Sequence, residues 1–486
     1  MAKLISADLT NNTLCILEYT TTDGQMLSFK EDAFDAKIVS HTYTDIGKVI
    51  FDKPITRIGD WAFSWCKSLT NVTIPDSVTT IGSSAFKSCT SLTSVTIPDS
   101  VTTIGEGAFS DCDSLTSVTI PNSVTTIGKY AFYYCNSLTS VTIGNDVTTI
   151  GEWAFYKCTS LTSVTIGNSV TTIGEGAFSD CDSLTSVIIP DSVTTIGDSA
   201  FRSCDSLTSV NIPNSVTTIG NGAFRYCTSL TSVTIPDSVT TIGDSAFYEC
   251  SRLTSVTIGN GVTTIGEWAF YLCKSLKEFK GKFAADGGRC LIIDGVLNAF
   301  VLGCGVTQYT IPDSVTTIGK SAFSECKSLT SVTIGNSVTT IGEWAFYKCT
   351  SLTSVIIPDS VTTIRYAAFW LCNSLTSVTI PNSVTTIGDR AFDGCNSLTS
   401  VTIPDSVTTI GDSAFEDCKG LTSVTIGKSV SEIGKEAFKG CNIDTIVCCP
   451  KIPPKINDSF GKFENLIIST GCEEAYANSD WGQYLE

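Results

Sequence analysis

The sequence predicts a β-rich solenoid of stacked repeats, and three observations carry that prediction. Leucine recurs every 23 residues from Leu69 to Leu276, and again from Leu329 to Leu421. Cysteine keeps the same spacing from Cys66 to Cys273 and from Cys326 to Cys441, which gives sixteen repeats. The apolar residues also keep one order inside every repeat. A unit this short cannot bury its apolar side alone, so neighbouring repeats must stack.

Each repeat divides into segments that can be assigned in chain order. Leu92, Val95 and Ile97 form the pattern Leu-x-x-Val-x-Ile, which predicts a strand whose apolar residues face the core and whose other residues face outward. Pro or Gly followed by Asp or Asn predicts a turn. Val-Thr-Thr-Ile-Gly predicts a second extended piece. We expect Ala-Phe-x-x-Cys to form one helical or 3₁₀ turn, because an acidic residue often precedes it and suits a helix start.

The repeats resemble the BspA-like class of leucine-rich repeats. The segments that carry the resemblance read IPDSVTTIGDSAF and SLTSVTI, and they recur over about residues 53 to 486. The resemblance implies a leucine-rich-repeat solenoid with capped ends. It also implies a surface or secreted protein that attaches to host proteins or to other cells.

The breaks in the period predict the organisation of the chain. Residues 1–50 do not follow it and are rich in alternating apolar residues, so they predict a β-rich N-terminal cap. Repeats at 51–273 and 312–441 flank an irregular segment at 274–311, where Asp294-Gly295 between apolar runs predicts a β-hairpin. Residues 442–486 predict a C-terminal cap whose last turn carries Trp481 and Tyr484. We expect one continuous solenoid rather than separate domains.

Composition disfavours several functional classes. The net charge is -18 and the pI is about 4.5, so the surface repels nucleic acids and anionic lipids. No run of apolar residues is long enough to insert into a membrane. The only histidine is His41, which argues against His-dependent catalysis and metal binding. We therefore expect no enzyme activity, no catalytic residues, no metal and no cofactor.

The amino terminus bears on localisation. Residues 1–17 contain only short apolar runs, and Leu4-Ile5 is soon followed by polar residues, so no signal-peptide core is expected there. A cell-surface or secreted location is implied only by the family resemblance. The localisation therefore stays open, and so does the oligomeric state.

Twenty-two cysteines raise the question of disulfides. Sixteen occur once per repeat, and stacking would give their side chains parallel directions that do not suit a disulfide. They predict a column of buried free thiols. Cys290 with Cys304, and Cys448, Cys449 and Cys472, are the better disulfide candidates.

Differences among the repeats concentrate in four positions, the two residues before Ala-Phe and the two after it. We call these the variable positions; they hold six of the seven Trp and nine of the fourteen Tyr. We expect their side chains to point outward and to form the recognition surface, since exposed aromatics are typical of binding hot spots. The alternative is that the rings lie flat over neighbouring repeats and only seal the solenoid. The candidate residues are Tyr130, Tyr133, Tyr134, Trp153, Tyr156, Trp268, Tyr271, Trp344, Tyr347, Tyr366 and Trp370.

These features favour a non-enzymatic binding or adhesion protein that recognises a protein or a glycan on another cell or matrix. An intracellular scaffold is a second interpretation, consistent with free thiols and the absence of an export signal. A third is an ice-binding-like surface protein, because Ser94-x-Thr96 and its counterparts form an array of outward Ser and Thr.

Overall fold

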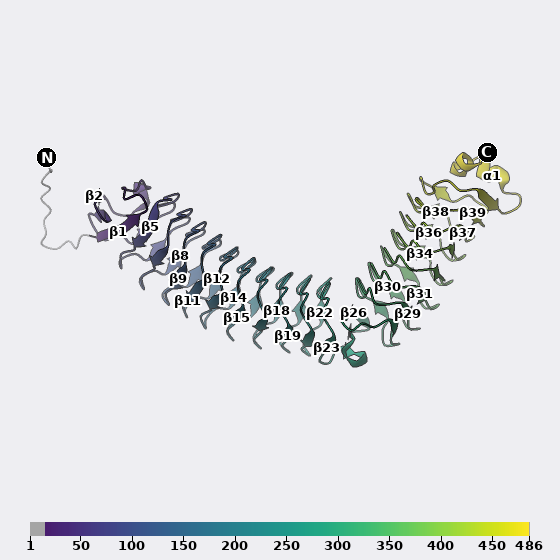
Figure 1. The fold of residues 1–486 in the computed structure, drawn as a ribbon, viewed down its shortest axis with the longest axis horizontal. Coiled ribbons are helices and arrows are strands. Elements are labelled where there is room, and N and C mark those ends of the chain that lie inside the picture. Colours follow the sequence, from purple (N-terminus) through teal and green to yellow (C-terminus); the bar gives the residue numbers. More distant parts are fainter. Residues whose placement is uncertain (1–14, 486) are drawn as a thin grey trace. The chain divides into compact units, whose positions relative to one another are not determined.

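The structure, a computed structural model, describes residues 15–485. Leu14 and the residues before it, on which the signal-peptide prediction rests, lie outside the described part. The chain divides into two compact units, Met1–Lys274 and Ser275–Glu486, and each is described by itself. Both consist of stacked two-strand rungs with a repeat of about 23 residues and almost no helix (Figure 1). The predicted β-rich solenoid is confirmed.

Each rung of the first unit contributes one strand to each of two parallel ladders. The first ladder contains the Ser-Val-Thr strands β5 (Leu69–Thr73), β7 (Ser94–Thr96), β9 (Ser117–Ile120), β11 (Ser140–Ile143), β13 (Ser163–Thr165), β15 (Ser186–Ile188), β17 (Ser209–Asn211), β19 (Ser232–Ile235) and β21 (Ser255–Ile258). The second contains the Thr-Ile strands β4 (Arg57–Ile58), β6 (Thr80–Ile81), β8 (Thr103–Ile104), β10 (Thr126–Ile127), β12 (Thr149–Ile150), β14 (Thr172–Ile173), β16 (Thr195–Ile196), β18 (Thr218–Ile219), β20 (Thr241–Ile242) and β22 (Thr264–Ile265).

Pairing between rungs is in register at the 23-residue spacing. Ser140 pairs with Ser117 in the first ladder, and Thr126 pairs with Thr149 in the second. The Thr-Ile ladder of this unit is one continuous ten-stranded sheet. The sheet that starts at β9 ends at β17, and the next sheet starts at β19.

The segment around Ala-Phe is not the helical turn that we predicted. It forms two successive tight turns, in which the amide of Ala85 donates to the carbonyl of Gly82 and that of Cys89 to Phe86. The third residue of each turn has a positive φ, 53° at Ser84 and 58° at Ser88. The alternate amides of Ser84 and Phe86 donate to Glu106 and Ala108 of the next rung, both at 2.7 Å. Local turn bonds therefore alternate with hydrogen bonds to the next rung, and together they satisfy these backbone amides without a continuous helix.

The core consists of identical side chains stacked on one another. In a typical rung Leu92, Val101, Ala108, Phe109 and Cys112 are all fully buried. The phenyl rings of successive rungs lie nearly parallel: those of Phe132 and Phe155 are 5.2 Å apart with planes 1° from parallel. Offset stacking at this spacing is favourable, so each ring is held by the rung before and the rung after.

The cysteine column is buried and free, as expected. All 22 cysteines are unpaired thiols, including the five that we considered for disulfides. Most column thiols donate to the Phe carbonyl of the preceding rung, as Cys89 does to Phe63 at 3.1 Å, whereas Cys66 at the start of the column donates to the Ser28 carbonyl of the cap. The same carbonyl accepts the amide of Cys66, so both of its lone pairs are used. Burial raises the pKa of most column thiols well above the ordinary value, for example at Cys112 and Cys135.

Residues 15–51 cover the first rung. They form β1 (Cys15–Thr21), the short 3₁₀ segment Glu31–Ala33, β2 (Ile38–Tyr43) and β3 (Gly47–Phe51). β1 pairs antiparallel with β3 on one side and with β5 on the other. The Tyr19 hydroxyl lies 2.6 Å from Nε2 of His41, and burial lowers the pKa of this histidine. The only histidine thus has a structural partner within the cap.

The second unit begins with an irregular segment containing β23 (Glu278–Lys280), β24 (Ala284–Ala285) and the 3₁₀ turn Asp286–Gly288. β25 (Cys290–Ile293) and β26 (Val296–Phe300) then pair antiparallel, with Asp294 and Gly295 between them at φ 49° and 78°. Two positive φ values are what the tight hairpin turn of an Asp-Gly pair requires. β26 joins the Thr-Ile ladder by pairing with β28 (Thr317–Ile318), so the hairpin starts the stack.

The rungs of the second unit repeat the two ladders. The Ser-Val-Thr type strands are β27 (Gln308–Thr310), β29 (Ser331–Thr333), β31 (Ser354–Ile356), β33 (Ser377–Val378), β35 (Ser400–Thr402), β37 (Ser423–Ile426), β39 (Thr445–Cys448) and β41 (Asn465–Ile468). After β28, the Thr-Ile type strands are β30 (Thr340–Ile341), β32 (Thr363–Ile364), β34 (Thr386–Ile387), β36 (Thr409–Ile410), β38 (Glu432–Ile433) and β40 (Lys455–Ile456). The chain ends with the helix α1 (Glu473–Ala477) and the 3₁₀ segment Asp480–Tyr484.

The end of the stack is closed by buried aromatic side chains. Tyr476 and Trp481 are fully buried, and the Trp481 indole donates to the carbonyl of Pro454 at 2.9 Å. The rings of Phe460 and Trp481 lie 5.2 Å apart. Phe460 itself continues the phenyl column from Phe438, so the indole takes the place of a further rung.

Truncating one ring of the phenyl column should destabilise the first unit measurably. We expect Phe201→Ala to lower the free energy of unfolding by about 3–5 kcal/mol, as other buried Phe truncations do. The effect should be confined to the neighbouring rungs, since each rung contacts only its neighbours. Urea denaturation measures the change, and Ser209→Ala on the exposed strand face is the control. An unchanged unfolding midpoint for Phe201→Ala would contradict the stacked core.

Thiol reactivity should follow burial. Cys304 and Cys449 are the half-buried cysteines, and the others are buried. The column thiols are also shielded from the reagent by burial, and burial raises the pKa of most of them, which lowers the fraction of reactive thiolate. Timed alkylation with mass spectrometry should label Cys304 and Cys449 first and the sixteen column thiols only after denaturation. Rapid labelling of the column, or disulfides within it, would show that the geometry is wrong.

Candidate recognition surface

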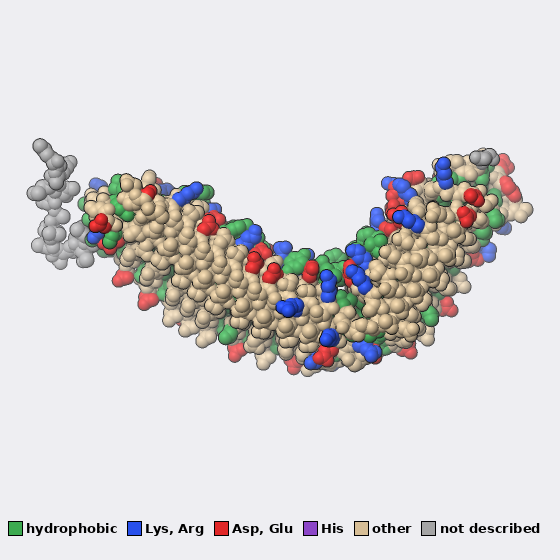
Figure 2. Space-filling view, viewed as in Figure 1, with side chains coloured by type: hydrophobic (Ala, Val, Ile, Leu, Met, Phe, Trp, Pro, Cys, Tyr) green, Lys and Arg blue, Asp and Glu red, His purple; other side chains and the backbone are tan. Residues whose placement is uncertain are grey.

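The variable positions lie in the tight turns, at the edge of each unit where charged and hydrophobic side chains gather in Figure 2. The adjacent broad face is tan, the colour of the backbone and of side chains that are neither hydrophobic nor charged. Half of the variable positions have a positive φ, and the residues that adopt it include Tyr130, Tyr134, Trp153, Trp268 and Trp344. Bulky residues rarely adopt this conformation. The amides at these positions donate to carbonyls of the next rung, as Tyr130 does to Glu152. These hydrogen bonds impose the positive φ on any residue at the position.

Side chains with positive φ lean onto the next rung instead of pointing straight outward. A Cβ atom built on Gly176 would collide with the indole ring of Trp153, from the preceding rung. A Cβ atom built on Gly394 would likewise lie 2.7 Å from the Cδ2 atom of Leu371 in the preceding rung. The prediction of outward side chains is therefore only partly right. Of the candidate aromatics only Trp268 is exposed, at 38%, and the others are half-buried. Trp61 and Trp65 occupy variable positions outside the candidate set and are exposed at 48% and 61%.

The densest aromatic group occupies two consecutive rungs of the first unit. We call Tyr130, Tyr133, Tyr134, Trp153 and Tyr156 the aromatic ridge. Tyr133 is central: its ring lies 4.5 Å from that of Tyr134, 5.0 Å from that of Tyr156 and 5.2 Å from that of Tyr130. The Trp153 ring meets Tyr156 edge-on at 5.1 Å. Contacts of this kind hold the rings in place before any partner arrives.

Charged neighbours stabilise the ridge. The Lys157 ammonium donates to the Tyr134 hydroxyl at 3.1 Å and lies 5.0 Å from the centre of that ring. The tyrosine partner raises the pKa of Lys157, so the lysine stays protonated at neutral pH. Burial, assisted by the adjacent tyrosines, raises the pKa of Tyr133 to about 12. The ridge is therefore a set of four phenol rings and one indole beside the Lys157 ammonium.

The other candidate residues form two smaller groups. Trp268 and Tyr271 lie together on the last full repeat of the first unit, with ring centres 6.0 Å apart. In the second unit Trp344 meets Tyr366 edge-on at 5.1 Å, and Tyr347 lies 4.9 Å from Trp370. The structure thus brings the predicted residues together within each group.

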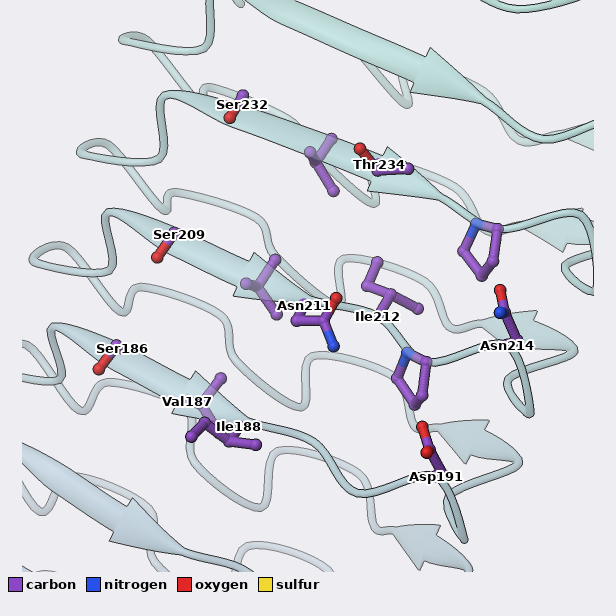
Figure 3. A pocket seen from close by; sticks show the side chains of 14 residues that line it. Ser186, Val187, Ile188, Asp191, Ser209, Asn211, Ile212, Asn214, Ser232 and Thr234 are labelled. Carbon is purple, nitrogen blue, oxygen red and sulfur yellow. The ribbon is translucent and has the colours of Figure 1, made fainter.

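The Ser-Val-Thr face is much more uniform. Its outward positions repeat Ser and Thr at most rungs, and the exceptions include Ile188, Asn211 and Ile356. Ile188 and Ile356 are 77% and 60% exposed. Ile188 and Asn211 line a shallow hollow of about 680 Å³ across β15, β17 and β19, with Ser209 and Thr234 beside them (Figure 3). This face varies at few places, so it offers less to distinguish one partner from another.

Much of the polar surface is used by the stack itself. Asn122 accepts the amide of Asn145 on the next rung at 2.8 Å, and the equivalent Asp237 accepts that of Asn260 at 2.7 Å. The Thr102 and Ser100 hydroxyls donate to carbonyls of the preceding rung.

Among residues 15–485, no group of His, Cys, Asp and Glu is arranged to hold a metal ion. In the same part of the chain, no helix is long and apolar enough to cross a membrane.

Sequence reasoning missed one feature of this edge. A hollow of about 290 Å³ opens beside the aromatic ridge, where Gly107, Glu106 and Asp111 lie between Lys87 and the tyrosines Tyr130 and Tyr133. The available signal was a glycine in a variable position next to a rung rich in tyrosine. The same signal occurs at Gly176, where the Trp153 ring covers the glycine and leaves no hollow. The sequence signal therefore does not show which of the two glycines opens a hollow.

The model of the BspA-type leucine-rich repeat region matches residues 36–162, 148–277, 297–418 and 385–477. The chain belongs to the BspA-type leucine-rich-repeat family. Solved structures agree with this assignment. A leucine-rich repeat protein from Bacteroides ovatus is 27% identical, with a TM-score of 0.54, over 88% of this chain and 98% of the other. A leucine-rich cell surface protein from Faecalibacterium prausnitzii is 27% identical, with a TM-score of 0.51, over 93% and 98%. No curated protein sequence matches the chain.

Proposed function

We propose that this BspA-type repeat protein is a non-enzymatic binding protein that recognises a macromolecular partner through its variable positions. The observation that carries the proposal is the aromatic ridge. Most residues of the repeat pack against or hydrogen-bond to the adjacent rungs. The variable positions differ from rung to rung and contain most of the Trp and Tyr residues. Preordered aromatic side chains contribute much of the binding energy in protein recognition.

An adhesion role on a cell surface is the form of this function that the family favours. The similar protein from Faecalibacterium prausnitzii is described as a cell surface protein. An acidic surface with a net charge of -18 suits a protein or glycan partner better than a nucleic acid. Specificity then comes from the combination of ring, charge and glycine on successive rungs.

The free thiols favour a second candidate, an intracellular scaffold that binds its partner through the same edge. All 22 cysteines are unpaired, which is typical of a reducing compartment. The ice-binding interpretation has less support. The Ser and Thr array is interrupted by Ile188 and Asn211, and the strand pairing on that face is broken between β17 and β19.

Substitutions on the two faces test whether the partner binds the variable positions or the Ser-Val-Thr face. One variant carries Tyr133→Ser, Tyr134→Ser, Trp153→Ser and Tyr156→Ser, and the other carries Lys in place of Thr96, Thr119 and Thr142. We expect the first to weaken binding to a partner captured from host cells or matrix by tenfold or more, because hot-spot residues each contribute at least about 2 kcal/mol. The second should bind nearly as well as the wild type.

Surface plasmon resonance on folded variants measures the two affinities. Circular dichroism melts show whether the substitutions leave the stack intact. Loss of binding only in the Thr variant would move the site to the strand face and refute the proposal.

A further inference from the structure

We propose that the hollow between Ser84 and Tyr130 is a binding site for a single neutral sugar ring. The inference rests on the proposed recognition function and names a ligand class for one end of the aromatic ridge. At about 290 Å³ the hollow is at the small end of ligand sites, which range from about 300 to 1,000 Å³. It therefore suits one ring of a glycan rather than an extended segment.

The hollow exists because of two small residues on consecutive rungs. Ser84 and Gly107 both have positive φ, 53° and 58°, and occupy the position whose side chain leans onto the next rung. A Cβ on Gly107 would meet nothing closer than the Ser84 hydroxyl at 3.4 Å. Residues 100–118 are repeated without change at 169–187, yet there the preceding rung supplies Trp153, which covers Gly176. The chain thus holds one open and one closed copy of the same segment.

The aromatic wall suits the apolar face of a sugar. The rings of Tyr130 and Tyr133 are 5.2 Å apart and meet at 84°, so they present a flat face beside an edge. Sugar C–H groups pack on an aromatic face as other apolar groups do. Contacts of Tyr133 with Tyr134 and Tyr156 fix this wall before binding, which reduces the entropy lost on association.

The polar groups suit hydroxyls rather than a charged ligand. Lys87 contributes a positive charge, Glu106 and Asp111 contribute negative ones, and all three line the hollow. Outside this lining, the Lys129 ammonium lies 5.1 Å from the Tyr130 ring centre and pairs with Glu152. Because both signs are present, neither an anion nor a cation is strongly preferred. Carboxylates accept from sugar hydroxyls and the ammonium donates to them, which orients a polyhydroxylated ring.

Ser84→Trp tests the site, because it copies the arrangement that closes the second segment. Trp153 leans onto Gly176 from a φ of 54°, and Ser84 has the same conformation, so a Trp at 84 should cover Gly107. Ser199→Trp is the matched control, since Ser199 at φ 54° precedes Gly222 in the same way. Asp111→Asn removes a polar contact, and Asp180→Asn makes the equivalent change in the closed copy.

The probes are neutral hexoses and N-acetylhexosamines, followed by saturation-transfer NMR at millimolar concentration. We expect at least one sugar to bind the wild type, the Ser199→Trp variant and the Asp180→Asn variant. Ser84→Trp should abolish the signal, and Asp111→Asn should weaken binding by about tenfold. Circular dichroism confirms that each variant is folded.

Absence of binding by any sugar, or binding that survives Ser84→Trp, would overturn the inference. These outcomes leave the proposed function standing if the aromatic-ridge variant still loses its macromolecular partner. If the ridge variant keeps its partner while Ser84→Trp loses the sugar, the proposed protein-recognition role fails and the sugar site stands.

Discussion

The structure depends on hydrogen bonds and side-chain contacts between residues 23 positions apart. Identical backbone groups face one another across each step, so Val141 pairs with Val118 and with Val164. The same register stacks phenyl on phenyl and directs most column thiols at a Phe carbonyl of the preceding rung. A rung gains these interactions only from its neighbours, which explains why the repeats must be nearly identical at the buried positions.

The same constraint leaves the variable positions free to change. Their backbone conformation is imposed by the next-rung hydrogen bonds of the turn, so side-chain identity is not needed to hold the turn. The chain accepts Gly107, Ser84, Tyr130 and Trp153 at equivalent places with φ between 53° and 58°. A non-glycine residue with positive φ costs about 1–3 kcal/mol, and the surrounding ladders offset that cost. Diversity therefore accumulates at one edge, where a partner can contact it.

Much of this fold could be predicted from the sequence, because the period and the apolar spacing determine both strands and the buried Leu, Phe and Cys columns. The Ala-Phe-x-x-Cys turn could not. Its apolar spacing matches a helical turn. A helix does not form because the amides of Ser84 and Phe86 donate to the next rung. The lean of the variable side chains could not be predicted either. The hollow at Gly107 depends on Ser84, 23 residues earlier, so no local pattern reveals it.

The central claim is that register with the neighbouring rung, rather than any local preference, determines the structure. Deleting Ser209–Thr231 removes one whole period, whereas deleting Ser209–Leu230 removes one residue fewer and shifts every later rung of the first unit. The account predicts that thermal unfolding of the first variant stays within about 5 °C of the wild type, and that the second loses a large part of its cooperative transition. Equal stability of the two deletions would contradict the account.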